Sequence, residues 1–143
     1  MSTLERAIQI AAQAHAGQTD KAGAPYILHP LRVMLAVDGE AERMAAVLHD
    51  VVEDSAVTFE DLAREGFDAA ILEALRALTK QPGESRVDAA HRAAANPIAR
   101  AVKLADNTDN SDIRRLPLLT PADHARLREY AAVREILLAA DRS

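Results

Sequence analysis

Apolar residues recur along most of the chain at spacings of three and four, the periodicity of helices that pack one face against a core. Short runs rich in Gly, Pro, Asn and Asp separate these segments and favour turns. No segment alternates apolar and polar residues in the way that would favour a β-strand. The pattern therefore predicts an all-α protein, and we expect one compact multi-helix domain over residues 1–143.

Capping residues and helix breakers indicate where the helices begin and end. The first helix is capped by Ser2 or Thr3, and Gly17 to Tyr26 forms a loop marked by two glycines and a proline. The later helices are expected over about 30–37, 40–52, 58–66, 68–79, 84–95, 97–110 and 120–140. The expected buried face of the first helix holds Leu4, Ile8, Ala11, Ala12 and His15.

Composition limits the class of protein. The 143 residues are 49% hydrophobic and 27% charged, typical of a soluble domain with a real core. Aromatic residues make up only 3%, so Leu, Ile, Val and Ala must fill that core. The net charge of −5 argues against a protein that coats nucleic acid, although a small anionic ligand in a locally basic pocket stays possible.

Two absences in the sequence narrow the chemistry and the location. The chain has no cysteine, which excludes disulfides, thiolate zinc sites and cysteine nucleophiles. Its N-terminus lacks the basic start and apolar stretch of a signal peptide, and no apolar run approaches the roughly 18 residues that span a bilayer. We therefore expect a cytoplasmic protein without a membrane partner.

The stretch from Ala45 to Ser55, AAVLHDVVEDS, places a histidine and three acids in a segment that otherwise favours burial. A buried imidazole beside a buried carboxylate is costly unless both have partners. On a single helix Glu53 would share a face with His49, and Asp54 with Asp50. Either this is a helix end that emerges into solvent, with His49 in the core, or the polar groups bind a metal.

Two further segments offer ligands of the same kind. Asp106 ends an apolar helix face, with Asn110 one turn later, and His29 lies at a loop-to-helix junction between apolar residues. Taken singly, each is explained by an exposed helix end or by a hydrogen-bonded core histidine. Together with His49 and Asp50 they form a nitrogen and oxygen set without sulfur, which suits manganese, iron, zinc or magnesium.

Three blocks of sequence resemble the HD superfamily of metal-dependent phosphohydrolases, and more narrowly the hydrolase domain of RelA/SpoT-type proteins and the small alarmone hydrolases. They are AHAGQTDKAGAPYILHPLRV at 14–33, LHDVVEDS at 48–55 and KLADNTDN at 103–110. The match runs in order over roughly Leu4 to Asn110. The resemblance implies an all-α HD domain and hydrolysis of the 3′-pyrophosphate of (p)ppGpp, with Mn²⁺ as the expected cofactor and Fe²⁺, Zn²⁺ or Mg²⁺ as alternatives.

The resemblance also implies a role for individual residues. The family's metal ligands fall on His29, His49, Asp50 and Asp106, and its catalytic acidic pair falls on Glu53 and Asp54. Asn110 matches a family position expected to hold a ribose or phosphate oxygen of the substrate. Apart from the resemblance, Lys21 and Lys103 are expected to bind the substrate by neutralising phosphate charge. Tyr130 in the last helix is expected either to pack against the nucleotide or to be a core or surface tyrosine. His15 is expected to be structural, and His91 and His124 to be solvated.

Two departures from the family pattern concern the substrate. Asp20 stands where the family has an arginine that lies against the guanine base, and the segment 79–97 is shorter and less basic than in the family. Lys80, Arg86 and Arg92 are the available substitutes for its phosphate-binding cations.

Two rival hypotheses remain: the same machinery acting on a different small nucleotide or phosphate ester, and a non-catalytic nucleotide-binding regulatory protein. The sequence leaves the oligomeric state open.

Overall fold

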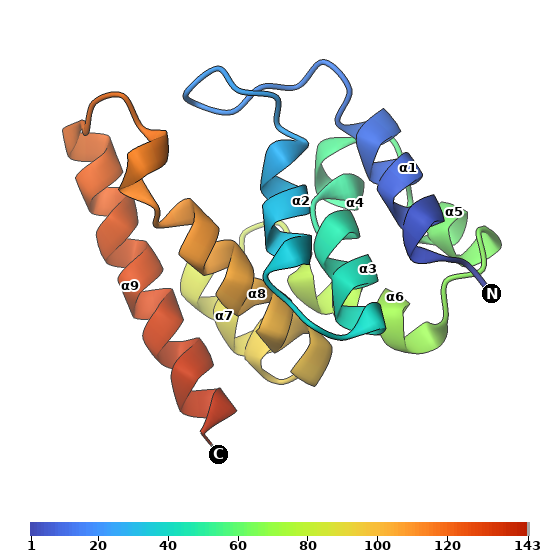
Figure 1. Ribbon diagram of the computed structural model, residues 1–143. Coiled ribbons are helices and arrows are strands. Elements are labelled where there is room, and N and C mark those ends of the chain that lie inside the picture. The colour runs from blue at the N-terminus through green and yellow to red at the C-terminus, as the bar shows by residue number, and fades with distance from the viewer. Residues whose placement is uncertain (143) are drawn as a thin grey trace.

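The computed structural model describes residues 1–142, which form α-helices joined by short turns (Figure 1). The helices are α1 (Leu4–Ala14), α2 (Leu28–Leu35), α3 (Glu40–Leu48), α4 (Val51–Asp54), α5 (Phe59–Arg64), α6 (Ala69–Leu78), α7 (Arg86–Ala94), α8 (Pro97–Asn110) and α9 (Pro121–Asp141), with a 3-10 helix, η1 (Ile113–Arg115). Over residues 1–142 the β-structure is confined to one isolated bridge, between Thr19 and Pro25. The predicted all-α class is confirmed.

Helix α3 is the centre of the core. Its last five residues, Met44 to Leu48, are all buried, and the helix packs against α1, α2, α6 and α8. Val33 on α2 and Val102 on α8 are fully buried against it. This arrangement brings the ends of α2, α3 and α8, which carry the candidate metal ligands, to one side of the core.

The predicted helix over 40–52 is wrong in one respect, because the structure divides it at His49–Asp50 into α3 and α4. The Nδ1 atom of His49 lies 2.5 Å from the carbonyl oxygen of Ala46, the group that would accept the Asp50 N–H in a continuous helix. Asp50 adopts φ −106° and ψ 0°. The break removes the shared stripes expected for His49 with Glu53 and Asp50 with Asp54, and it turns His49 and Asp50 toward the same point.

Most of the predicted helix starts are confirmed. Thr3 and Asn96 accept backbone N–H groups of the first turn of α1 and α8, and Thr58 and Thr120 form complete capping boxes at α5 and α9. The predicted start at 30 is two residues late, since α2 begins at Leu28. On the predicted apolar face of α1, Ala12 is exposed, whereas Ala7 and Ile10 are buried.

Helix α9 belongs to the same packed body, running beside α8 along one edge of the molecule (Figure 1). Its residues Val133 and Leu137 are buried against Ala90 and Ala94 of α7.

We expect Leu137→Ala to lower the free energy of unfolding by about 2–5 kcal/mol, the range for a fully buried leucine, when measured by urea denaturation. Glu135→Ala on the exposed face is the control and should change it by less than about 0.5 kcal/mol; equal effects would contradict this packing.

In residues 1–142, none of the helices has both the length and the apolar character needed to cross a membrane.

Candidate functional site

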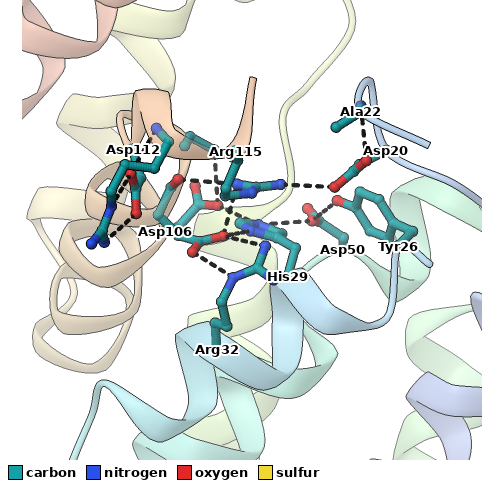
Figure 2. Close-up of polar contacts among 12 residues, drawn as sticks. Asp20, Ala22, Tyr26, His29, Arg32, Asp50, Asp106, Asp112 and Arg115 are labelled. Carbon is teal, nitrogen blue, oxygen red and sulfur yellow. Dashed lines mark hydrogen bonds and ion pairs between the residues drawn. The ribbon is translucent and has the colours of Figure 1, made fainter. Parts of the chain in front are cut away.

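The four predicted metal ligands lie close together between α2, the α3–α4 turn and α8. Figure 2 shows three of them, His29, Asp50 and Asp106. One ligand atom each from His29, His49 and Asp50 lies within 4.8 Å of the others. Asp106 Oδ1 lies 2.9 Å from His29 Nε2 and 3.3 Å from His49 Nε2. His29, His49 and Asp50 thus form a group that one ion could join, and the carboxylate of Asp106 lies beside both of its imidazoles.

The hydrogen bonding of His49 fits a metal ligand. Its Nδ1 bonds to the Ala46 carbonyl, which can only accept, so Nδ1 carries a proton and Nε2 is the ring atom available to a metal. This Nε2 is buried without a hydrogen-bond partner, although Asp50 Oδ2 lies 3.0 Å away. A lone pair facing carboxylate oxygens needs a proton or a cation between them, and a divalent metal supplies the cation.

The electrostatics of the cluster lead to the same conclusion. Burial alone would lower the pKa of His49, but Asp50 and Asp106 outweigh it and raise that pKa well above its ordinary value. Burial likewise would raise the pKa of Asp106, but Lys103 and the two imidazoles hold it well below its usual range. The protein therefore keeps the buried carboxylate of Asp106 and the partly buried carboxylate of Asp50 ionised, at a place that attracts positive charge.

Asp109 holds the outer side of His29, a role that the sequence analysis missed. His29 Nδ1 lies 2.6 Å from Asp109 Oδ2, so the carboxylate accepts the Nδ1 proton and leaves Nε2 facing Asp106. Asp109 also accepts hydrogen bonds from Arg32 and Arg115. Its place three residues after Asp106 in KLADNTDN, on the same helix face, was the available signal.

Tyr26 is a second residue of the site that the sequence did not indicate. Its hydroxyl donates to Asp50 Oδ2 at 2.5 Å (Figure 2), and burial followed by the Asp50 charge raises its pKa above the ordinary value. Its ring packs between those of His15 and His29, with centroid distances of 4.9 and 5.7 Å. His15 is buried and hydrogen-bonds Gln18, as its expected structural role requires, whereas His91 and His124 are exposed.

A cavity of about 340 Å³ opens over the four ligands. Glu53 lines it, and burial followed by the charges of Asp50 and Asp54 raises the pKa of Glu53. Burial and Asp50 also raise the pKa of Asp54, but Asp54 is not among the residues that line this cavity. The two acids predicted as a catalytic pair therefore occupy different positions relative to the cavity.

Lys103 and Asn110 both line the cavity and both bind Asp106. Lys103 Nζ lies 3.0 Å from Asp106 Oδ2, and this charge raises the pKa of Lys103 despite its burial. Asn110 Nδ2 donates to Asp106 Oδ1 at 3.0 Å. Both side chains thus fix a candidate ligand while facing the space where a substrate would bind.

A second cavity of about 290 Å³, which we call the loop cavity, adjoins the first. Tyr26, His29, Asn110 and Tyr130 line both. Lys21 lines the loop cavity, and slight burial together with the cations of Arg126 and Arg86 lowers its pKa. The substrate residues predicted from the sequence therefore all border one continuous region, in an otherwise acidic protein.

The structure accounts for the departures from the family pattern. Asp20 folds its own loop, because its Oδ1 accepts the backbone N–H groups of Ala22 and Ala24, and its Oδ2 pairs with Arg115. Arg92 bonds Glu84 and two backbone carbonyls, so it is committed to holding the turn before α7. Lys80 and Arg86 line the cavity, and Arg86 also pairs with Glu129 at 3.6 Å.

The HD-domain family model matches residues 7–141. The chain belongs to the HD-domain family. This assignment confirms the resemblance inferred from the three motifs, and it covers nearly the whole length of the chain.

Relatives of this HD-domain protein include a probable GTP pyrophosphokinase and a bifunctional (p)ppGpp synthase/hydrolase. It is 33% identical over 138 residues to a probable GTP pyrophosphokinase of Mycobacterium leprae, covering 88% of this chain and 17% of that protein. It is 38% identical over 82 residues to the bifunctional (p)ppGpp synthase/hydrolase SpoT of Escherichia coli, covering 54% of this chain and 11% of that protein. The chain thus spans less than a fifth of either relative.

A solved structure of a metazoan orthologue of SpoT, described as hydrolysing ppGpp, has a similar fold. It superposes with a TM-score of 0.75 at 26% sequence identity, covering 94% of this chain and 84% of that chain. The HD-domain fold therefore extends over both proteins for most of their length.

Proposed function

We propose that this HD-domain protein is a metal-dependent phosphohydrolase that removes the 3′-pyrophosphate of (p)ppGpp, with Mn²⁺ held by His29, His49, Asp50 and Asp106. The observation that carries the proposal is the convergence of two imidazole Nε2 atoms on the carboxylates of Asp50 and Asp106 beneath a cavity. The names of the relatives and of the similar structure support the choice of substrate.

The side chains around the cavity have complementary tasks. When bound, the metal ion would supply a water molecule of lowered pKa at neutral pH. Glu53, whose pKa is raised, would take up a proton from the attacking water and pass it on. Lys103 and Lys80 would place positive charge beside the pyrophosphate, and Asn110 would keep Asp106 in place.

The loop cavity gives the remainder of the nucleotide a place to bind. Tyr130 and Tyr26 border both cavities, so a ligand with its pyrophosphate over the metal ligands can extend between these rings. Arg86 lines the first cavity and lies over the Tyr130 ring, with its guanidinium carbon 5.3 Å from the centroid, so it would add a further cation near the bound nucleotide.

An assay with pure protein, Mn²⁺ and ppGpp tests the proposal. We expect release of GDP and pyrophosphate, loss of the activity with a chelator, and recovery on adding Mn²⁺. ATP, which lacks a 3′-phosphate, is the matched control and should not be cleaved. Absence of turnover by metal-loaded protein would overturn ppGpp as the substrate, and the same assay with other nucleotides that carry a 3′- or 2′-phosphate tests the rival.

A further inference from the structure

Three charged side chains from three separate segments form an unbroken series of contacts that ends at His29. Asp20 in the α1–α2 loop pairs with Arg115 of η1, with 3.2 Å between Oδ2 and Nη2. Arg115 in turn donates through Nη1 to both Asp109 Oδ2 and the Asp109 carbonyl, at 3.0 Å each. Asp109 accepts the Nδ1 proton of His29.

We propose that Asp109 is a positioning residue for the metal ligand His29, and that Asp20, acting through Arg115, couples the loop cavity to that ligand. The proposal rests on the metal site of the proposed function but not on its substrate. It assigns a task to Asp20, the residue that departs most clearly from the family pattern.

The geometry of Asp109 suits orientation of the imidazole. Arg32 binds its two oxygens through Nε and Nη2, at 2.7 and 3.1 Å, so the carboxylate cannot rotate freely. The carboxylate is nearly buried, with 12% of its side chain exposed. A carboxylate fixed in this way selects the tautomer with its proton on Nδ1 and makes Nε2 a stronger metal ligand.

The position of Arg115 explains how the loop can influence this arrangement. Arg115 and Asp20 both line the loop cavity, while Asp109 lies one contact further in. Arg115 is shared between two carboxylates, so a ligand that competes for its guanidinium or moves Asp20 alters the restraint on Asp109. Binding in the loop cavity and metal binding are therefore expected to depend on each other.

Isosteric variants test the proposal by measuring Mn²⁺ affinity by calorimetric titration, without any substrate. Asp109→Asn should weaken Mn²⁺ binding by about 10- to 100-fold, the range for partners of metal ligands. Asp20→Asn keeps the oxygen that accepts the Ala22 and Ala24 N–H groups, so it removes only the pairing with Arg115. It should weaken binding by about two- to tenfold, as expected inside one ion-pair network.

The control variant is Asp38→Asn, since Asp38 is exposed in the turn between α2 and α3 and lines neither cavity; it should leave the affinity unchanged. The double variant Asp20→Asn/Asp109→Asn should bind Mn²⁺ no more weakly than Asp109→Asn, because Asp20 acts through Asp109. If Asp109→Asn does not fold, Arg115→Gln should reproduce the loss of Mn²⁺ affinity seen in Asp20→Asn. The double variant Asp20→Asn/Arg115→Gln should then show no further loss of affinity.

Three results would overturn the inference. They are an unchanged affinity in Asp109→Asn or Arg115→Gln, additive losses in a double variant, and a wild-type protein that binds no divalent metal. The last also overturns the metal site of the proposed function. If the Mn²⁺ affinities of the variants are as expected but the wild-type protein does not hydrolyse ppGpp, only the proposed substrate is overturned.

Discussion

Replacing Asp106 by asparagine is expected to abolish measurable ppGpp hydrolysis and to weaken Mn²⁺ binding by more than about 100-fold, beyond the loss from partners of metal ligands. The reason is the central position of its carboxylate, with Oδ1 at 2.9 and 3.3 Å from the two imidazole Nε2 atoms. The substitution keeps the shape of the side chain but removes its charge, so it tests charge and ligation together. Hydrolysis of ppGpp and calorimetric Mn²⁺ titration measure the two effects.

The fold of this variant must be measured separately, because the substitution leaves Lys103 without its buried partner. Combining Asp106→Asn with Lys103→Met removes the opposite charge and should recover stability without recovering Mn²⁺ binding. Asp88→Asn, on the exposed side of α7, is the charge-matched control. Near-normal Mn²⁺ affinity in a folded Asp106→Asn protein would show that Asp106 is not a ligand.

The sequence predicted the candidate ligands because each is a polar residue among apolar neighbours, on a helix face or, for His29, at a loop-to-helix junction. His29, His49, Asp50 and Asp106 are polar groups in segments that the periodicity assigns to the core, and burial of such groups requires partners. The structure brings these four together from segments up to 77 residues apart. Their identity as metal ligands stays a prediction until a metal titration is made.

The features that the sequence did not predict depend on single side-chain contacts. The division of the helix at His49 results from an imidazole that takes the Ala46 carbonyl, which no apolar periodicity records. Arg115 follows α8 in a short 3-10 turn, and its role exists only because the loop bearing Asp20 comes within 3.2 Å of it. Asp109 resembled any exposed acid at a helix end, since its partners lie on α2 and η1.

The two acids of the predicted catalytic pair differ in their position relative to the cavity. Glu53 and Asp54 both follow the break in the helix, yet only Glu53 is among the residues lining the cavity over the metal ligands. The backbone carbonyl of Asp54 accepts a hydrogen bond from Gln18 at 3.0 Å, which ties α4 to the start of the α1–α2 loop. The two acids are thus expected to contribute unequally to proton transfer.

Glu53→Gln is expected to lower kcat for ppGpp by about 10²- to 10⁴-fold, the usual contribution of a general acid or base, with Mn²⁺ affinity changed by less than about threefold. Glutamine keeps the length and hydrogen-bonding capacity of the side chain, but it cannot take up a proton from water. Steady-state kinetics at saturating Mn²⁺ measure kcat and KM separately, and calorimetric titration measures the metal affinity. Loss of kcat without loss of metal distinguishes proton transfer from ligation.

Asp54→Asn is the matched comparison, because it makes the same chemical change one residue along α4, at a residue that does not line the cavity. It should lower kcat less than Glu53→Gln does, and it should leave KM for ppGpp nearly unchanged. Equal losses in the two variants would assign proton transfer to the pair as a unit. Full turnover in Glu53→Gln with bound Mn²⁺ would remove Glu53 from the reaction, and it would favour a cavity in which the metal-bound water needs no protein base.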